Sequence, residues 1–172
     1  MSTTEQHSEF PAYHLADGAG VTDVWWPFSA GVARYTQKLT GAQTSGRLFQ
    51  MLVTEPRGAA PPLHVHRDAD ETFYVLEGEI SVYAGDAEIA ASASDFVFVP
   101  RGCPHTFLVR SERARMFVTF GPAGVEGFFT KLGTSATDGR SKPAAQAPDP
   151  KLFATVADRY AMDIVGPPPS LD

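Results

Sequence analysis

An alternation of apolar and polar residues with a period of two runs through residues 46–120 and limits the fold more than any other part of the sequence. In Arg47–Glu55, one face of a strand would carry Phe49, Met51, Val53 and Glu55, and the other Leu48, Gln50, Leu52 and Thr54. Similar short segments follow at Glu71–Glu77, Ile80–Ala84, Glu88–Ala90, Asp95–Val99, Thr106–Arg110 and Arg113–Phe120. Because a sheet of short strands must close or stack to hide its edges, this spacing predicts an all-β sandwich or barrel.

The rest of the chain predicts helical additions to one domain, since 172 residues suit a single domain and no internal repeat is present. We expect short helices at Gly124–Leu132 and Asp149–Met162, the second with Asp149 as its N-cap and Pro150 in its first turn. The expected parts are an N-terminal arm (1–22), a barrel with flanking strands and a helix (23–133), and a C-terminal loop, helix and proline-rich tail (134–172).

A dense apolar patch at Val24–Phe28 contains Trp25, Trp26 and Phe28 and follows no regular period. We expect it to plug one end of the core or to form a subunit contact. A role of the tryptophans in stacking on a ligand is the weaker alternative.

Charge and apolar content exclude several classes of partner. The chain has 14 basic and 20 acidic residues, a formal net charge of −6, which argues against nucleic acid because phosphates require a basic surface. No apolar run approaches the ~20 residues that span a membrane, and the first ten residues lack the features of a secretory signal. A single cysteine, Cys103, excludes an intramolecular disulfide. We therefore expect a cytoplasmic protein.

Three of the five histidines fall in two short segments of this strand-rich region. His64 and His66 are separated by one residue, so on an extended chain they project to the same side. Glu71 would join them from the apolar side of the next strand. The segment Pro100–Pro104 is rich in turn residues and would deliver His105 onto a later strand.

Three imidazoles and one carboxylate form a donor set that suits Fe, Ni, Co, Mn, Cu or Zn better than Mg or Ca. Four protein ligands on a six-coordinate metal would leave two positions for water, substrate or dioxygen, which is typical of a catalytic site. An isolated pair such as His64 and His66 more often has a structural role. The combined spacing of all four residues is what favours a metal site.

These two segments resemble the signature motifs of the cupin superfamily. The first matches Gly-x5-His-x-His-x4-Glu-x6-Gly at every fixed position between Gly58 and Gly78. The second follows Gly-x5-Pro-x-Gly-x2-His-x3-Asn, except that Ser94 replaces the first glycine and Val109 the final asparagine. The resemblance implies a double-stranded β-helix, or jelly-roll barrel. It also implies that the metal ligands are His64, His66, Glu71 and His105.

Within this superfamily, the same segments together with residues 36–52 and 120–133 resemble the small single-cupin relatives of quercetin 2,3-dioxygenase. That resemblance implies a metal-dependent dioxygenase that cleaves a flavonol-like enolic aromatic substrate, a flavonoid, with O2 and releases carbon monoxide. The expected cofactor is one divalent transition metal, Ni, Fe, Mn or Co, with Cu or Zn as alternatives. Glu71 would be both a metal ligand and the acceptor of the enol proton, and the protein would be a homodimer.

Two other functions use the same four residues: a non-oxidative metal cupin (an isomerase, cyclase or lyase) and a ligand-binding module without turnover. For the dioxygenase, the candidate walls of the substrate pocket are aromatic: Tyr35, Phe49, Phe73, Phe107 and Phe117. We interpret Cys103 as structural and expect Arg101 to form a surface salt bridge. His7 and His14 lie in the predicted arm, and Phe128 and Phe129 would cap the barrel.

Overall fold

The computed structural model describes residues 10–28, 30–137 and 141–171. The first nine residues of the predicted arm, with His7, lie outside the described residues, as do residues 138–140 of the predicted C-terminal loop.

The described residues form strands and three short helices, and none of these helices is long and apolar enough to cross a membrane. The strands are β1 (Thr22–Trp26), β2 (Ala33–Leu39), β3 (Phe49–Pro56), β4 (Leu63–His66), β5 (Asp70–Glu77), β6 (Glu79–Ala84), β7 (Ala87–Ser92), β8 (Phe96–Val99), β9 (His105–Val109), β10 (Arg113–Gly121), β11 (Thr134–Ser135) and β12 (Met162–Gly166). The helices are α1 (Gly41–Thr44), α2 (Glu126–Leu132) and α3 (Pro150–Arg159).

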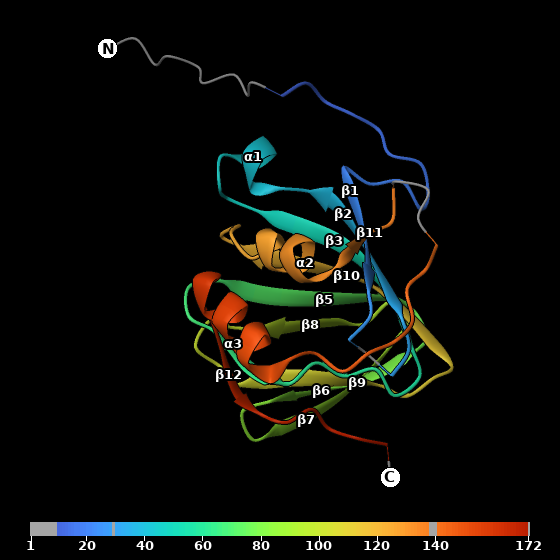
Figure 1. Ribbon diagram of the computed structural model, residues 1–172, viewed down its shortest axis with the longest axis vertical. Coiled ribbons are helices and arrows are strands. Elements are labelled where there is room, and N and C mark those ends of the chain that lie inside the picture. The colour runs from blue at the N-terminus through green and yellow to red at the C-terminus, as the bar shows by residue number, and fades with distance from the viewer. Residues whose placement is uncertain (1–9, 29, 138–140, 172) are drawn as a thin grey trace.

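Two antiparallel sheets face each other across the core (Figure 1). The larger sheet has the order β11-β1-β2-β3-β10-β5-β8, and the smaller sheet has the order β12-β4-β9-β6-β7. Helices α2 and α3 pack together through Phe128 and Phe153, whose ring centroids lie 5.3 Å apart. This architecture confirms the all-β jelly-roll class with few short helices.

The inward faces of the strands follow the predicted alternation. Phe49, Met51, Val53 and Glu55 of β3 are all buried. On β5, Glu71, Phe73 and Val75 are buried, whereas Tyr74 points outward and is 42% exposed. The period of two therefore identified which side chains enter the interior.

The predicted helix at Asp149–Met162 is shorter in the structure, and its predicted C-terminal end was wrong. Helix α3 ends at Arg159, and Ala161 has a positive φ of 54° that turns the chain away from the helix. Met162 then begins β12, which pairs with β4. This pairing joins segments about a hundred residues apart, so no local pattern could reveal it.

The apolar patch at Val24–Phe28 lies mostly within β1, which the sequence did not predict. Trp26 is 6% exposed and packs edge-on against Phe28, with ring centroids 5.1 Å apart. Trp25 lies on the opposite face, where the guanidinium of Arg34 is 5.7 Å from its ring centroid. Trp26 therefore lies in the core, as the core-plugging interpretation predicts, whereas Trp25 lies outside it.

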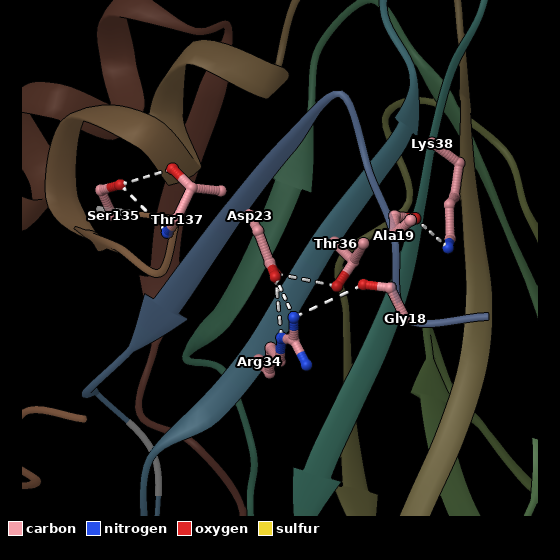
Figure 2. Close-up of polar contacts among 8 residues, drawn as sticks. All are labelled: Gly18, Ala19, Asp23, Arg34, Thr36, Lys38, Ser135 and Thr137. Carbon is pink, nitrogen blue, oxygen red and sulfur yellow. Dashed lines mark hydrogen bonds and ion pairs between the residues drawn. The ribbon is translucent and has the colours of Figure 1, made fainter. Parts of the chain in front are cut away.

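A polar network outside the larger sheet ties the N-terminal segment to β1 and β2 (Figure 2). The carboxylate of Asp23 is buried and accepts hydrogen bonds from Arg34 Nε at 2.9 Å and from Thr36 Oγ1 at 2.9 Å. Arg34 also donates to the carbonyl of Gly18, and Lys38 donates to the carbonyl of Ala19. The hydrogen bond to Asp23 raises the pKa of Arg34, so the guanidinium remains charged at any physiological pH.

Candidate functional site

The four predicted metal-ligating residues meet in the interior between the two sheets. His64 and His66 project inward from β4, and His105 begins β9 directly opposite His64 in the strand register. Glu71 enters from β5 of the larger sheet, opposite Phe120 of β10. Each of the four residues is at most 8% exposed. One sheet thus supplies the three imidazoles and the other supplies the carboxylate.

The donor atoms of these four residues lie within 4.8 Å of one another. The Nε2 atom of His105 is 2.7 Å from Oε2 of Glu71, and the Nε2 atom of His66 is 3.2 Å from the same oxygen. We call this group the His/Glu cluster.

Backbone carbonyls orient two of the imidazoles. Nδ1 of His64 donates to the carbonyl of Pro62 at 2.8 Å, and Nδ1 of His105 donates to the carbonyl of Cys103 at 2.9 Å. A carbonyl can only accept, so these bonds place a proton on Nδ1 and turn Nε2 toward the cluster. The proline- and glycine-rich turn before His105 makes this possible: Gly102 has a φ of 78° and its N–H donates to the carbonyl of His66 at 2.8 Å.

Burial and mutual repulsion control the charges in the cluster. Burial is the largest cause that lowers the pKa of His64, and the charges of the neighbouring His105 and His66 lower it further, to about 3. This imidazole is therefore neutral at physiological pH. Burial also opposes ionisation of His105 and Glu71, but their shared hydrogen bond outweighs it. The pKa of His105 is therefore raised and that of Glu71 is lowered from their ordinary values.

This donor set fits a divalent transition metal. Imidazole nitrogens with one carboxylate oxygen suit Fe, Ni, Co, Mn, Cu or Zn, and the buried cluster can hold such an ion. The hydrogen bonds on Nδ1 of His64 and His105 are the outer contacts that usually accompany metal-binding histidines.

A cavity of about 250 Å³ opens beside the cluster, and His64, His66 and Glu71 form part of its wall. Most of the remaining wall is apolar and comes from both sheets, α2 and the C-terminal segment. Three of the five predicted wall residues line this cavity: Tyr35, Phe73 and Phe107.

The structure does not place the other two predicted wall residues in the cavity. Phe49 is fully buried and stacks on Phe120, and it is Phe120 that lines the cavity. Phe117 lies on the outer face of the larger sheet, because its neighbours Met116 and Val118 on β10 point inward. The prediction for Phe117 was therefore wrong, because the alternation of β10 gives this residue the outward position.

Sequence reasoning missed several residues of the cavity wall. The alternation of β3 predicts that Glu55 faces inward, on the same side as Met51 and Val53. This position could have identified Glu55 as part of the cavity wall. Phe153 and Met162 come from the C-terminal segment, whose docking over the cavity has no local signal.

The remaining residues singled out in the sequence contribute no side chain to the His/Glu cluster. Arg101 forms a surface ion pair with Asp70, as predicted, at 2.8 Å. Cys103 is a free thiol in the turn before His105 and contributes a backbone carbonyl rather than sulfur to the cluster. Phe128 and Phe129 of α2 are buried at one end of the barrel and line the cavity.

Comparisons with known proteins agree with this geometry. A family model described as "Cupin domain" matches residues 51–120. Quercetin 2,3-dioxygenase from Bacillus subtilis (strain 168) is 26% identical over 134 residues, which cover 75% of this chain and 40% of that protein. Quercetin 2,3-dioxygenase from Aspergillus japonicus is 30% identical over 110 residues, which cover 58% of this chain and 31% of that protein. The chain therefore matches less than half the length of these curated relatives.

Among solved structures, an RmlC-like cupin from Shewanella frigidimarina NCIMB 400 superimposes with a TM-score of 0.54 and 21% sequence identity. The match covers 69% of this chain and 96% of that one. At this level of identity, the likeness supports the fold alone.

Proposed function

Because this chain is a cupin relative, we propose that it is a metal-dependent dioxygenase of the quercetin 2,3-dioxygenase type. It would use O2 to cleave a flavonol-like enolic aromatic substrate. The observation that carries the proposal is a buried His/Glu cluster opening onto a cavity with aromatic walls. The two curated relatives named above support the choice of reaction.

In this proposal His64, His66, Glu71 and His105 hold one divalent transition metal. When bound, such a metal polarises the enolic oxygen of the substrate and lowers its pKa. Glu71 accepts the enol proton on a carboxylate oxygen. Hydrogen bonds from imidazole nitrogens lower the pKa of Glu71, and the same nitrogens are the proposed metal ligands. The basicity of Glu71 therefore depends on whether a metal is bound.

The cavity walls position the substrate and exclude water. Phe73 and Phe107 contact each other edge-to-face, with ring centroids 5.9 Å apart, and present apolar surface next to the cluster. A planar aromatic enol can stack on such rings with its oxygen toward the imidazoles. A dry wall also strengthens the electrostatic attraction between the ionised enol and a cation.

The test combines metal analysis of the purified protein with oxygen uptake in the presence of quercetin. We expect close to one transition metal per chain and oxygen consumption that depends on the flavonol. Metal without oxygen uptake would contradict the dioxygenase proposal and favour a non-oxidative metal cupin. No metal after reconstitution would contradict the proposed ligand role of the cluster.

A further inference from the structure

The wall of the cavity is almost entirely apolar outside the His/Glu cluster. Among the described residues that line it, Tyr35 and Glu55 are the only polar ones beyond the cluster, and the hydroxyl of Tyr35 donates to Oε1 of Glu55 at 2.5 Å. Aliphatic side chains of β3, β10 and β12, several prolines and a group of aromatic rings form the rest. Apart from this pair, the described wall therefore presents apolar surface to a ligand.

Four aromatic side chains gather in one part of this wall. Trp26 of β1, Phe28, Phe128 of α2 and Phe153 of α3 all line the cavity. The ring of Trp26 lies 5.1 Å from Phe28, 5.5 Å from Phe128 and 6.2 Å from Phe153, measured between ring centroids. We call these four residues the aromatic end of the cavity.

A continuous series of rings joins the aromatic end to the His/Glu cluster. The ring of Phe120 lies 5.2 Å from His66 and 6.4 Å from Phe129. Phe129 in turn lies 5.7 Å from Trp26, and all four residues line the cavity. A planar ligand held at the cluster therefore has aromatic surface beside it along its length.

Tyr35 shows that the aromatic end and the cluster are close enough for one ligand. Its ring stacks on Trp26 at a centroid distance of 5.4 Å. Burial is the largest cause that raises the pKa of its hydroxyl, and the charges of Glu55 and Glu71 raise it further. Glu71 of the cluster thus acts electrostatically on the ring that lies next to the aromatic end, so a ligand of three rings can reach both.

A phenolic hydroxyl is unfavourable at the aromatic end. None of its four side chains can accept a hydrogen bond, because phenylalanine has no polar side-chain atom and the indole N–H of Trp26 only donates. A hydroxyl moved there from water loses its acceptor, whereas a bare ring or a methyl group gains by leaving water. An apolar pocket rejects an added hydroxyl by about a hundredfold at most, so the effect is a preference rather than an exclusion.

We propose that the aromatic end binds a ring of the ligand that carries no hydroxyl group, so that the cavity selects sparingly hydroxylated aromatic enols. The inference rests on the proposed function, because it assumes an aromatic enol with its oxygen at the cluster. Quercetin, which has hydroxyls at both ends of its ring system, would then be a ligand, but a weaker one than 3-hydroxyflavone.

Anaerobic binding of matched flavonols to the Co2+-loaded protein tests the proposal without turnover. Two probes, 3,4′-dihydroxyflavone and 3,7-dihydroxyflavone, each carry a second hydroxyl at one end of the ring system. Each is compared with the probe in which a methyl group of similar size replaces that hydroxyl, 3-hydroxy-4′-methylflavone or 3-hydroxy-7-methylflavone. In at least one pair we expect the methyl probe to bind about tenfold more tightly, and in neither pair should the hydroxyl probe bind more tightly.

Phe153→Ala locates the preference in the aromatic end. It removes one ring and opens the wall beneath α3 to water, which can then solvate the hydroxyl of a bound probe. We expect the tenfold ratio to fall to about threefold or less. The matched control is Leu152→Ala, the preceding residue of the same helix, which is 55% exposed and should keep the full ratio. If Phe153→Ala does not fold, Phe28→Ala removes another ring of the aromatic end and has the same expected result.

Equal affinities within both pairs of probes in the wild-type protein would overturn the inference. Tighter binding of either hydroxyl probe would also overturn it, because that hydroxyl would have found an acceptor in the wall. The same holds for an unchanged ratio in the folded ring-deletion variant. In each of these cases, oxygen uptake with 3-hydroxyflavone would leave the proposed function standing. Failure of every probe to bind would overturn both proposals.

Discussion

The carboxylate of Glu71 and the imidazole of His105 form the shortest contact of the cluster, at 2.7 Å. A carboxylate accepts this bond only while His105 carries a proton on Nε2, because its Nδ1 proton is already committed to the carbonyl of Cys103. In this arrangement His105 carries both ring protons and is positively charged. A proton and a metal ion thus compete for the same nitrogen.

This competition gives the pH dependence of metal binding a definite sign. The raised pKa of His105 means that the imidazole is charged below that pKa and must lose a proton to become a ligand. We expect metal affinity to rise with pH from about 6 up to the raised pKa of His105, by up to tenfold per pH unit, and then to level off. His64 adds no proton to this process, because its pKa of about 3 keeps it neutral in this range.

Calorimetric titration of the metal-free protein with Co2+ at pH 7, in two buffers of different ionisation enthalpy, measures the protons released. Because the pKa of His105 is raised, we expect a measurable proton release of up to one proton per metal ion, and a larger release at lower pH. Metal binding without proton release, or an affinity that is flat between about pH 6 and 8, would contradict the charged state of His105.

The proposed base can be tested by Glu71→Gln. This change keeps the size of the side chain and one oxygen for the metal, but removes the ability to accept the enol proton. We expect kcat for the flavonol to fall at least about a hundredfold, while the protein retains some metal. Steady-state oxygen uptake and metal analysis of the same preparation measure both. The matched control is Glu77→Gln, which changes an exposed carboxylate paired with Arg113. Near wild-type turnover in Glu71→Gln would exclude the proton-acceptor role.

At the level of elements, helix α3 depends on its N-cap. The carboxylate of Asp149 accepts hydrogen bonds from the N–H groups of Lys151 and Leu152, at 2.9 and 3.0 Å, and Pro150 occupies the first turn. This helix carries Phe153 into the cavity wall. Local stability of α3 is therefore coupled to the shape of the cavity.

We expect Asp149→Ala to lower the free energy of unfolding by about 1 kcal/mol, with a decrease in Tm of roughly 2–4 °C, because two N–H groups lose their acceptor. Metal content should not change, since α3 supplies none of the four cluster residues. Thermal unfolding of the variant beside Lys151→Ala, an exposed change in the same turn, measures the effect. Identical Tm values for the two variants would show that the cap does not stabilise the helix.

The sequence was sufficient for features that depend on neighbouring residues. The parity of β3 and β5, the turn before His105 and the N-cap of α3 all follow from local spacing. The turn between β7 and β8 also forms without the glycine of the family motif, with Ser94 at a φ of 78° and its N–H donating to the carbonyl of Val75. A left-handed residue costs about 1 kcal/mol or more for a non-glycine side chain, which the surrounding strand pairs can offset.

Features that depend on distant pairing could not be predicted. Strand β12 forms because Met162 and Ile164 find register partners in His66 and His64 of β4, far away in the sequence. The same holds for β1, where Trp26 faces the cavity only because β1 pairs with β2 in that register. Tertiary pairing, rather than the local pattern, decides these elements.

For the whole molecule, the position of the cluster between the sheets has a consequence for stability. His64, His66 and His105 belong to the smaller sheet and Glu71 to the larger one. A metal held by all four would bridge the two halves of the barrel, and unfolding would have to release it. Binding to the folded state alone stabilises that state by mass action.

We therefore expect added metal to raise the Tm of the metal-free protein. At a free metal concentration of a hundred times Kd, the gain is about 2.7 kcal/mol, or roughly 5–10 °C for a chain of this length. Differential scanning calorimetry with Co2+, followed by excess chelator, measures the shift and its reversal. His64→Ala removes one ligand from the smaller sheet, and in this variant the shift should shrink by at least half. An equal shift in the wild-type protein and in His64→Ala would mean that the stabilising metal binds elsewhere. No shift in the wild-type protein would mean that the cluster does not hold the sheets together through a metal.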